Sequence, residues 1–129
     1  MKFKYSHNYY PAAPIVDVTF ITAAEHERIG PLPAMVDSGA DGTIVPLHYL
    51  DEIQAPPTVE MVMRSQWGER RHVLLYLVDV RIGDVTLPGI EVVGDDLSDE
   101  IVIGRDVLNH LRVVLNGPAE IMELSESSS

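Results

Sequence analysis

The stretch Met35–Thr43, which reads MVDSGADGT, places two carboxylates and two glycines between short apolar segments. Two apolar residues lead directly into Asp37, and the chain becomes apolar again at Ile44. Asp, Ser and Gly are common turn residues, so the simplest interpretation is a turn between two strands. Two carboxylates in one turn also make this stretch the first candidate for a chemical site.

The composition indicates one ordinary globular domain. The chain has 129 residues, of which 46% are apolar and 22% are charged, and this suits a single hydrophobic core. Acidic residues outnumber basic ones by 20 to 9, and the net charge of −11 argues against a nucleic-acid partner. We place the domain at residues 1–124, because residues 125–129 (SESSS) are too polar to pack and should form a disordered tail.

Several classes of protein are excluded or disfavoured by what the sequence lacks. There is no cysteine, which excludes disulfides, thiolate catalysis and Cys-ligated zinc. The N-terminal segment has no uninterrupted apolar run typical of a secretory signal, and no segment approaches the ~20 apolar residues of a membrane-spanning helix. We therefore expect a cytoplasmic protein without a membrane partner.

Short strand-like segments, separated by Gly, Pro and Asp, dominate the sequence. Two short helices are expected at Pro46–Ile53, which begins with Pro, and at Arg105–Leu111, where apolar residues recur at helical spacing. The pattern predicts an all-β protein, a small barrel or sandwich. Pro31 and Pro33 are expected to form a turn before the second strand. The expected strands are Ile15–Ile21, Ala34–Val36, Thr58–Met63, His72–Val80, Val85–Leu87, Ile90–Val93, Arg112–Leu115 and Glu120–Leu124.

Two chemical interpretations of MVDSGADGT fail on the residues themselves. A calcium-binding loop would use Asp37, Asp41 and Gly42 at its first, fifth and sixth positions. Its third position is a glycine, however, and His48 stands at the twelfth, where a bidentate Glu is required. Ser38 lacks the Gly-x-Ser-x-Gly elbow of serine hydrolases. The histidines are scattered singly, without the spacing of metal ligands, so we expect no metal site.

The whole string resembles the catalytic loop of the retropepsin-like (retroviral-type) aspartic proteases: two apolar residues, Asp-Ser/Thr-Gly-Ala-Asp, one residue, Thr, then apolar residues. A second element, Ile101–Leu108 (IVIGRDVL), resembles the family's apolar-apolar-Gly-Arg-Asn/Asp-apolar-Leu element. Between them, Thr58–Val80 has the form of a long hairpin with its tip near Gln66–Gly68, where the family carries its flap. The resemblance covers Ile15–Leu124 and implies a small closed acid-protease-type barrel with a flap hairpin, functional as a homodimer.

The resemblance gives Asp37 the catalytic role. Peptide hydrolysis by two carboxyl groups needs one ionised group, which takes a proton from water, and one protonated group, which donates to the carbonyl oxygen. Two carboxyls about 3 Å apart cannot both ionise, so the pair shares one proton. This chain has one Asp-Ser-Gly, and the second carboxyl must therefore be Asp37 of a symmetry-related chain. The mechanism calls for no cofactor, and the expected partners are a second copy and a peptide or protein substrate.

The same resemblance implies roles for the neighbouring residues. Asp41 is expected to receive main-chain N–H groups of the substrate and to pair with Arg105, whose planar guanidinium suits a carboxylate. Trp67 would cover bound peptide from the flap tip, although a core aromatic is an equally good interpretation. The remaining expected residues are Ser38, Gly39, Ala40 and Thr43 as support of the active-site loop, and Gly39, Gly68 and Val102 as substrate contacts.

Two further segments have expected roles in this interpretation. The acidic run Asp95–Glu100 is either a solvated loop or a border of the substrate cleft that favours basic or neutral side chains. The segment Glu120–Leu124 alternates polar and apolar residues, and we expect it to be an edge strand that pairs with the second subunit.

The function that follows is that of an aspartic endopeptidase. The enzyme is favoured over a silent scaffold because the chain has Asp37, Ser38 and Gly39 together with Asp41 and Arg105. A degenerate scaffold would have little reason to keep all five. The alternatives are a catalytically silent dimeric scaffold or peptide-binding module of the same fold, and an unrelated β-barrel binding domain.

Overall fold

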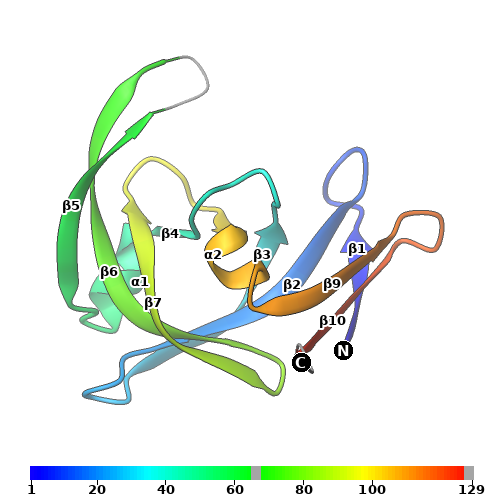
Figure 1. Ribbon diagram of the computed structural model, residues 1–129, viewed down its shortest axis with the longest axis horizontal. Helices are drawn as coiled ribbons and strands as arrows, with labels where there is room; N and C mark the ends of the chain where they lie inside the picture. The colour runs from blue at the N-terminus through cyan, green and yellow to red at the C-terminus, as the bar shows by residue number, and fades with distance from the viewer. Residues whose placement is uncertain (65–67, 127–129) are drawn as a thin grey trace.

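A computed structural model of the chain describes residues 1–64 and 68–126, which form ten strands and two short helices (Figure 1). Residues 65–67 and 127–129 lie outside the described part. The elements in chain order are β1 (Lys2–Ser6), β2 (Ala13–Ile21), β3 (Arg28–Val36), β4 (Ile44–Pro46), α1 (Leu47–Glu52), β5 (Pro57–Arg64), β6 (Arg70–Ile82), β7 (Val85–Asp95), β8 (Ile101–Ile103), α2 (Arg105–Leu108), β9 (Leu111–Asn116) and β10 (Ile121–Glu126).

Six of these strands close into a barrel. Neighbouring strands follow the order β6-β7-β4-β8-β3-β2, and β2 pairs again with β6, with Val18 opposite Ile82 and Ile21 opposite Asp79. The β3–β8 and β4–β7 pairs are parallel, and the other pairs in the ring are antiparallel. The predicted all-β fold with a small closed barrel is confirmed.

Alternation along the strands fills the barrel. On β2, Val16, Val18 and Phe20 point inward and are buried, whereas Asp17 between them is exposed. α1 adds Leu50 to this core, and α2 adds buried apolar side chains of its own. The core members include Val16, Val18, Phe20, Val45, Leu50, Val78, Val80, Ile103, Val107 and Leu108.

Two predicted breaks at proline lie inside continuous strands. β3 runs unbroken past Pro31 and Pro33, where we expected a turn, and β7 joins the two strands predicted on either side of Pro88. In both places the ladder is irregular: the β2–β3 register shifts between Val18 and Phe20, and the β6–β7 register shifts between Val78 and Val80. Proline lacks the N–H that a regular ladder uses, so it is tolerated where the pairing is already displaced.

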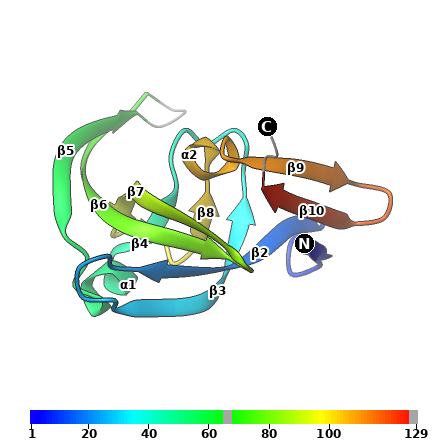
Figure 2. The ribbon, with the colours of Figure 1, turned by 60° about the horizontal axis from the view of Figure 1, so that its bottom comes forward.

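The ends of the chain form a second sheet beside the barrel. β10 pairs with β1 along one edge and with β9 along the other, while β1 continues into pairing with β2 (Figure 2). The predicted strand Glu120–Leu124 is displaced in the structure, because Glu120 has a φ of +53° and β10 begins at Ile121 and includes Ser125 and Glu126. Contrary to our expectation, this strand is not an edge, because both of its sides are paired within the subunit.

Two smaller differences arise from strand pairing. α2 ends at Leu108, three residues before the predicted end, because Leu111 already pairs with Glu126 as the first residue of β9. β1 was not predicted, since its five residues KFKYS include no β-branched side chain and depend on β10 and β2 for partners. None of the helices in the described residues is long and apolar enough to span a membrane.

Candidate active site

The loop between β3 and β4 carries the MVDSGADGT motif and arches over α2 (Figures 1 and 2). β3 ends at Val36, paired with Ile103 of β8, and the Asp37 N–H continues the ladder by donating to the Ile103 carbonyl at 3.0 Å. The Asp37 side chain is exposed, and its Oδ1 accepts the Gly39 N–H at 2.9 Å. The backbone of Asp37 is thus fixed by the barrel, while its carboxylate lies at the surface.

The far end of the loop is fixed by Asp106 of α2. The Thr43 hydroxyl donates to Asp106 Oδ1 at 2.7 Å, and the Thr43 N–H donates to Asp106 Oδ2 at 3.0 Å. Asp106 Oδ1 also accepts the Val107 N–H at 2.9 Å, and the Thr43 hydroxyl oxygen accepts the Gly104 N–H at 3.1 Å. Thr43 is fully buried, so this network holds a polar side chain with its hydrogen-bonding capacity satisfied.

Gly104 is required by close packing between the loop and the start of α2. A Cβ at this position would lie 2.6 Å from the Gly42 carbonyl carbon and oxygen and 2.9 Å from the Ala40 oxygen. The backbone φ of Gly104 is −100°, so the requirement is steric and does not come from an unusual conformation. The two sequence motifs are therefore in direct contact, backbone against backbone.

Arg105 makes the third attachment between the two motifs. Its backbone N–H donates to the Ala40 carbonyl at 2.9 Å, and its Nη1 donates to the Ser38 carbonyl at 2.9 Å. Its Nη2 forms an ion pair with Asp41 Oδ1. In the single subunit this pair is open to water, because the Asp41 side chain is 93% exposed and the Arg105 side chain 43% exposed. The pair is therefore worth much less here than a fully buried one.

The other predicted contact residues lie on β8 and on the β5–β6 hairpin. Val102 is half-buried between Ile101 and Ile103, both buried, so its side chain projects from the opposite face of β8 to the core. The hairpin rises beyond the barrel on the side of the Asp37 loop (Figure 1). Gly68 stands near its tip with a φ of +83°, and Trp67 lies outside the described residues.

The acidic run after β7 is tied to two neighbouring elements. Arg71 of β6 reaches Asp95 at 3.3 Å and Asp96 at 3.1 Å, and so connects the hairpin to this loop. The Tyr9 hydroxyl, from the β1–β2 loop, donates to Glu100 at 2.5 Å. This hydrogen bond, with smaller contributions from burial and from the charge of Glu100, raises the pKa of Tyr9.

Sequence reasoning missed Gly104, Asp106 and Tyr9 as parts of this site. Gly104 and Asp106 stand inside the Ile101–Leu108 motif, which the sequence had already indicated. Their contacts with Thr43, Gly42 and Ala40 could not be predicted, because these depend on how the two motifs pack. Tyr9 had no sequence signal, since nothing local relates it to Glu100. Among the described residues there is no group of three His, Asp or Glu side chains that could hold a metal ion.

Comparison with known proteins assigns the family. The family model described as "gag-polyprotein putative aspartyl protease" matches residues 26–110, which include both motifs. The chain belongs to the retropepsin-like aspartic protease family. No curated protein matches the chain. A solved structure, described as a retropepsin-like aspartic protease from Rickettsia conorii, matches with a TM-score of 0.66 at 12% sequence identity, covering 99% of this chain and 92% of that one. At this identity the likeness shows a shared retropepsin-like fold.

Proposed function

We propose that this retropepsin-like protein is an aspartic endopeptidase that works as a symmetric homodimer, with one Asp37 from each subunit. The observation that carries the proposal is the Asp37 loop itself. Its backbone is held by Ile103, Arg105 and Asp106, while the Asp37 carboxylate is exposed at the surface. A carboxylate that is rigidly positioned and open to solvent can meet both a substrate and a second carboxylate.

The chemistry needs only these two carboxyl groups and one water molecule. The ionised Asp37 takes a proton from water as the water oxygen bonds to the peptide carbonyl carbon, and the protonated Asp37 donates to the carbonyl oxygen. The resulting tetrahedral diol collapses when the Asp37 that took the water proton donates it to the amide nitrogen, the other Asp37 takes a proton from a hydroxyl group as the C=O bond forms again, and the C–N bond breaks. Gly39 would leave its carbonyl free for substrate, Ser38 would hold the two loops together, and Asp41 would accept substrate N–H groups. The substrate is an extended peptide or protein segment.

A pH profile of peptide cleavage tests the proposal. Wild-type protein and Asp37→Asn are assayed against a peptide library across the acidic and neutral range, with stability followed in parallel by circular dichroism. The shared proton leaves the dyad as pH rises, so the wild-type rate should be highest in acid and fall toward neutral pH. Asp37→Asn should keep the fold and lose cleavage at every pH.

Two outcomes would contradict the proposal. One is cleavage by Asp37→Asn in a preparation shown to be free of wild-type protein. The other is a wild-type rate that continues to rise beyond neutral pH while the protein stays folded. A folded wild-type protein that cleaves nothing in the library, but binds peptide, would instead favour the silent scaffold.

A further inference from the structure

The base of the β5–β6 hairpin holds a cavity that takes no part in the proposed function. This base cavity has a volume of about 490 Å³ and is lined by residues 22–25, 54, 56, 77–79 and 88–89. Figures 1 and 2 show the β2–β3 loop beside the start of β5, whereas the Asp37 loop lies on the side of the hairpin tip. A cavity of this volume is in the range of small-molecule binding sites.

Apolar side chains form most of the walls of the base cavity. Leu77 of β6 faces outward, because Val78 beside it points into the core, and Leu77 is 36% exposed. The Leu77 N–H donates to the Pro56 carbonyl at 3.0 Å, which fixes two of the walls relative to each other. The other apolar wall residues are also exposed, and they are Ala23, Ala24 and Pro88. Exposed apolar groups gathered in one hollow are typical of a ligand site.

A β-bulge fixes a carboxylate at this cavity. The β6–β7 register shifts between Val78 and Val80, so Pro88 and Gly89 together stand opposite Asp79. Gly89 has a φ of +67°, and its N–H donates to Asp79 Oδ1 at 3.0 Å. Bulges of this kind re-aim side chains and are common beside functional sites. The half-buried Asp79 carboxylate is thus held at the cavity wall.

A second carboxylate, that of Glu25, lines the same cavity from the β2–β3 loop. Asp79 stands opposite Ile21 near the end of β2, and this pairing places it beside the loop that follows. In the described part of the chain neither Asp79 nor Glu25 forms an ion pair, and no Lys or Arg lines the cavity. The charge that complements the base cavity is therefore positive.

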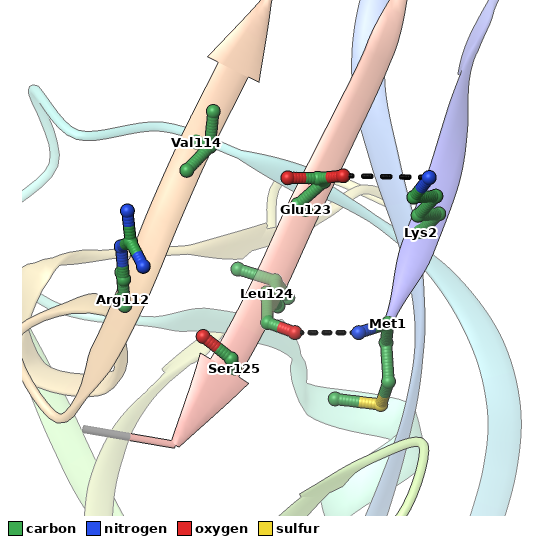
Figure 3. A pocket seen from close by; sticks show the side chains of 7 residues that line it. All are labelled: Met1, Lys2, Arg112, Val114, Glu123, Leu124 and Ser125. Carbon is green, nitrogen blue, oxygen red and sulfur yellow. Dashed lines mark hydrogen bonds and ion pairs between the residues drawn. The ribbon is translucent and has the colours of Figure 1, made fainter. Parts of the chain in front are cut away.

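The cavity beside the terminal strands, drawn in Figure 3, makes an instructive contrast. Its volume is about 180 Å³, and Lys2 and Glu123 within it pair with each other. The N-terminal ammonium of Met1 donates to the Leu124 carbonyl at 2.7 Å. These charged groups already have partners within the chain, whereas the two carboxylates of the base cavity do not pair with a basic side chain of the described residues.

We propose that the base cavity binds a small amphipathic cation. The aromatic or aliphatic body of this ligand contacts the apolar walls, and its ammonium group lies near Asp79 and Glu25. Burial of the body supplies affinity, and the carboxylates select for positive charge. Asp79 contributes more than Glu25, because water screens the exposed Glu25 more strongly. The inference does not depend on the proposed function, since Asp37 is not part of this cavity.

Three ligands that share an indole ring and a two-carbon chain test the proposal. Tryptamine carries a positive charge, 3-ethylindole none and indole-3-propionate a negative charge. Each is titrated into ¹⁵N-labelled protein, and the amide chemical shifts give both the site and the dissociation constant. Tryptamine should shift the amides that line the base cavity and bind about tenfold more tightly than 3-ethylindole. Indole-3-propionate should bind most weakly of the three.

Substitutions at the cavity separate the contributions of charge and apolar contact. Asp79→Asn keeps an oxygen for the Gly89 N–H and should weaken tryptamine binding about fivefold, and Glu25→Gln about twofold. Leu77→Ala should weaken tryptamine and 3-ethylindole by the same factor. Asp84→Asn makes the same charge change in the exposed β6–β7 turn, outside the cavity, and should leave binding unchanged. Circular dichroism confirms that each variant is folded.

Four results would overturn the proposal. They are no shift of the lining amides, binding of indole-3-propionate as tight as that of tryptamine, unchanged tryptamine binding by Asp79→Asn, and an equal loss in Asp84→Asn. The last would show that tryptamine is attracted by net charge alone. Asp37→Asn should bind tryptamine as the wild type does; if it does not, then tryptamine binds at the catalytic loop and the base cavity is not its site. Each of these results leaves the proposed peptidase function standing.

Discussion

The Asp37 loop and the β5–β6 hairpin lie on the same side of the barrel and are held in opposite ways (Figure 1). The loop is attached to β8 and α2 by backbone ladder bonds, by Asp106 and by Arg105, and its Thr43 is fully buried. The hairpin strand β5 pairs only with β6 among the described strands, and nearly all of its residues are exposed.

This difference would suit the two tasks that the proposed peptidase function gives to these regions. A catalytic carboxylate must be held to within a fraction of an ångström, which requires attachments on several sides. A covering hairpin must open for substrate and close over it, which requires few attachments to the rest of the fold. Substitutions in the loop should therefore change global stability, whereas substitutions in the hairpin should change turnover with little effect on stability.

The largest effect is expected for Gly104→Ala. The added Cβ would overlap the Gly42 backbone at 2.6 Å, and the backbone cannot move away as a flexible side chain would. We expect a loss of about 3 kcal/mol of unfolding free energy, together with loss of cleavage. Urea denaturation measures the first and the peptide assay the second. An unchanged midpoint would show that the two motifs do not pack as closely as described.

Asp106→Asn should cost less and should test the network around Thr43. Both carboxylate oxygens accept backbone N–H groups, from Thr43 and from Val107, so an amide in either orientation turns an NH₂ group toward one of them. An unsatisfied donor in this partly buried site costs about 1–3 kcal/mol. Thermal unfolding of Asp106→Asn, compared with that of Asp106→Ala and the wild type, measures the loss of stability. If Asp106→Asn is as stable as the wild type, then the carboxylate is not needed as a double acceptor.

Arg105→Ala tests the most exposed of the three loop attachments. The ion pair with Asp41 is open to water, so we expect a loss of about 1 kcal/mol in the isolated subunit. A larger loss at concentrations where the protein is dimeric would indicate that the partner covers the pair. Denaturation at several protein concentrations separates the two contributions. Arg105→Lys, which keeps the charge but not the planar fork, is the matched control.

The smallest effect on global stability is expected for Gly68→Ala in the hairpin. A Cβ there would meet nothing within 4 Å, so the only penalty is the positive φ of +83°, on the order of 1 kcal/mol. Because the hairpin makes few attachments, this strain should be relieved locally, leaving the unfolding midpoint nearly unchanged while turnover falls. The control is Gly104→Ala, the same substitution at the start of α2, where the chain packs against the Asp37 loop. A large drop in the unfolding midpoint would show that the hairpin is part of the cooperative core.

Local sequence pattern predicted much of the fold. The elements that were missed or wrongly bounded all depend on how strands pair in the folded sheet. The strands predicted at Ile15–Ile21 and His72–Val80 from their apolar and β-branched residues lie within β2 and β6 of the barrel. The strand through Pro31 was predicted only from Ala34 onward, and the strand through Pro88 was predicted as two strands, because a proline breaks a regular ladder. In the folded sheet, register shifts accommodate both prolines. β1 depends on partners more than a hundred residues away, such as Glu123 opposite Lys2, and no local pattern reveals them.

Residue type and spacing within short segments were enough to predict the two motifs, the resemblance to the family and a fold made mostly of strands, whereas the closed barrel was expected only from that resemblance. The sequence also brought Asp41 and Arg105 together as an expected pair, and the structure has that contact. Three features appear only in the folded chain: Gly104 packs on Gly42, Asp106 holds Thr43, and among the described strands β9 rather than β10 is the open edge of the terminal sheet. Packing distances and strand neighbours are set by long-range pairing, and a strand's own alternation shows which face is buried but not which edge is free.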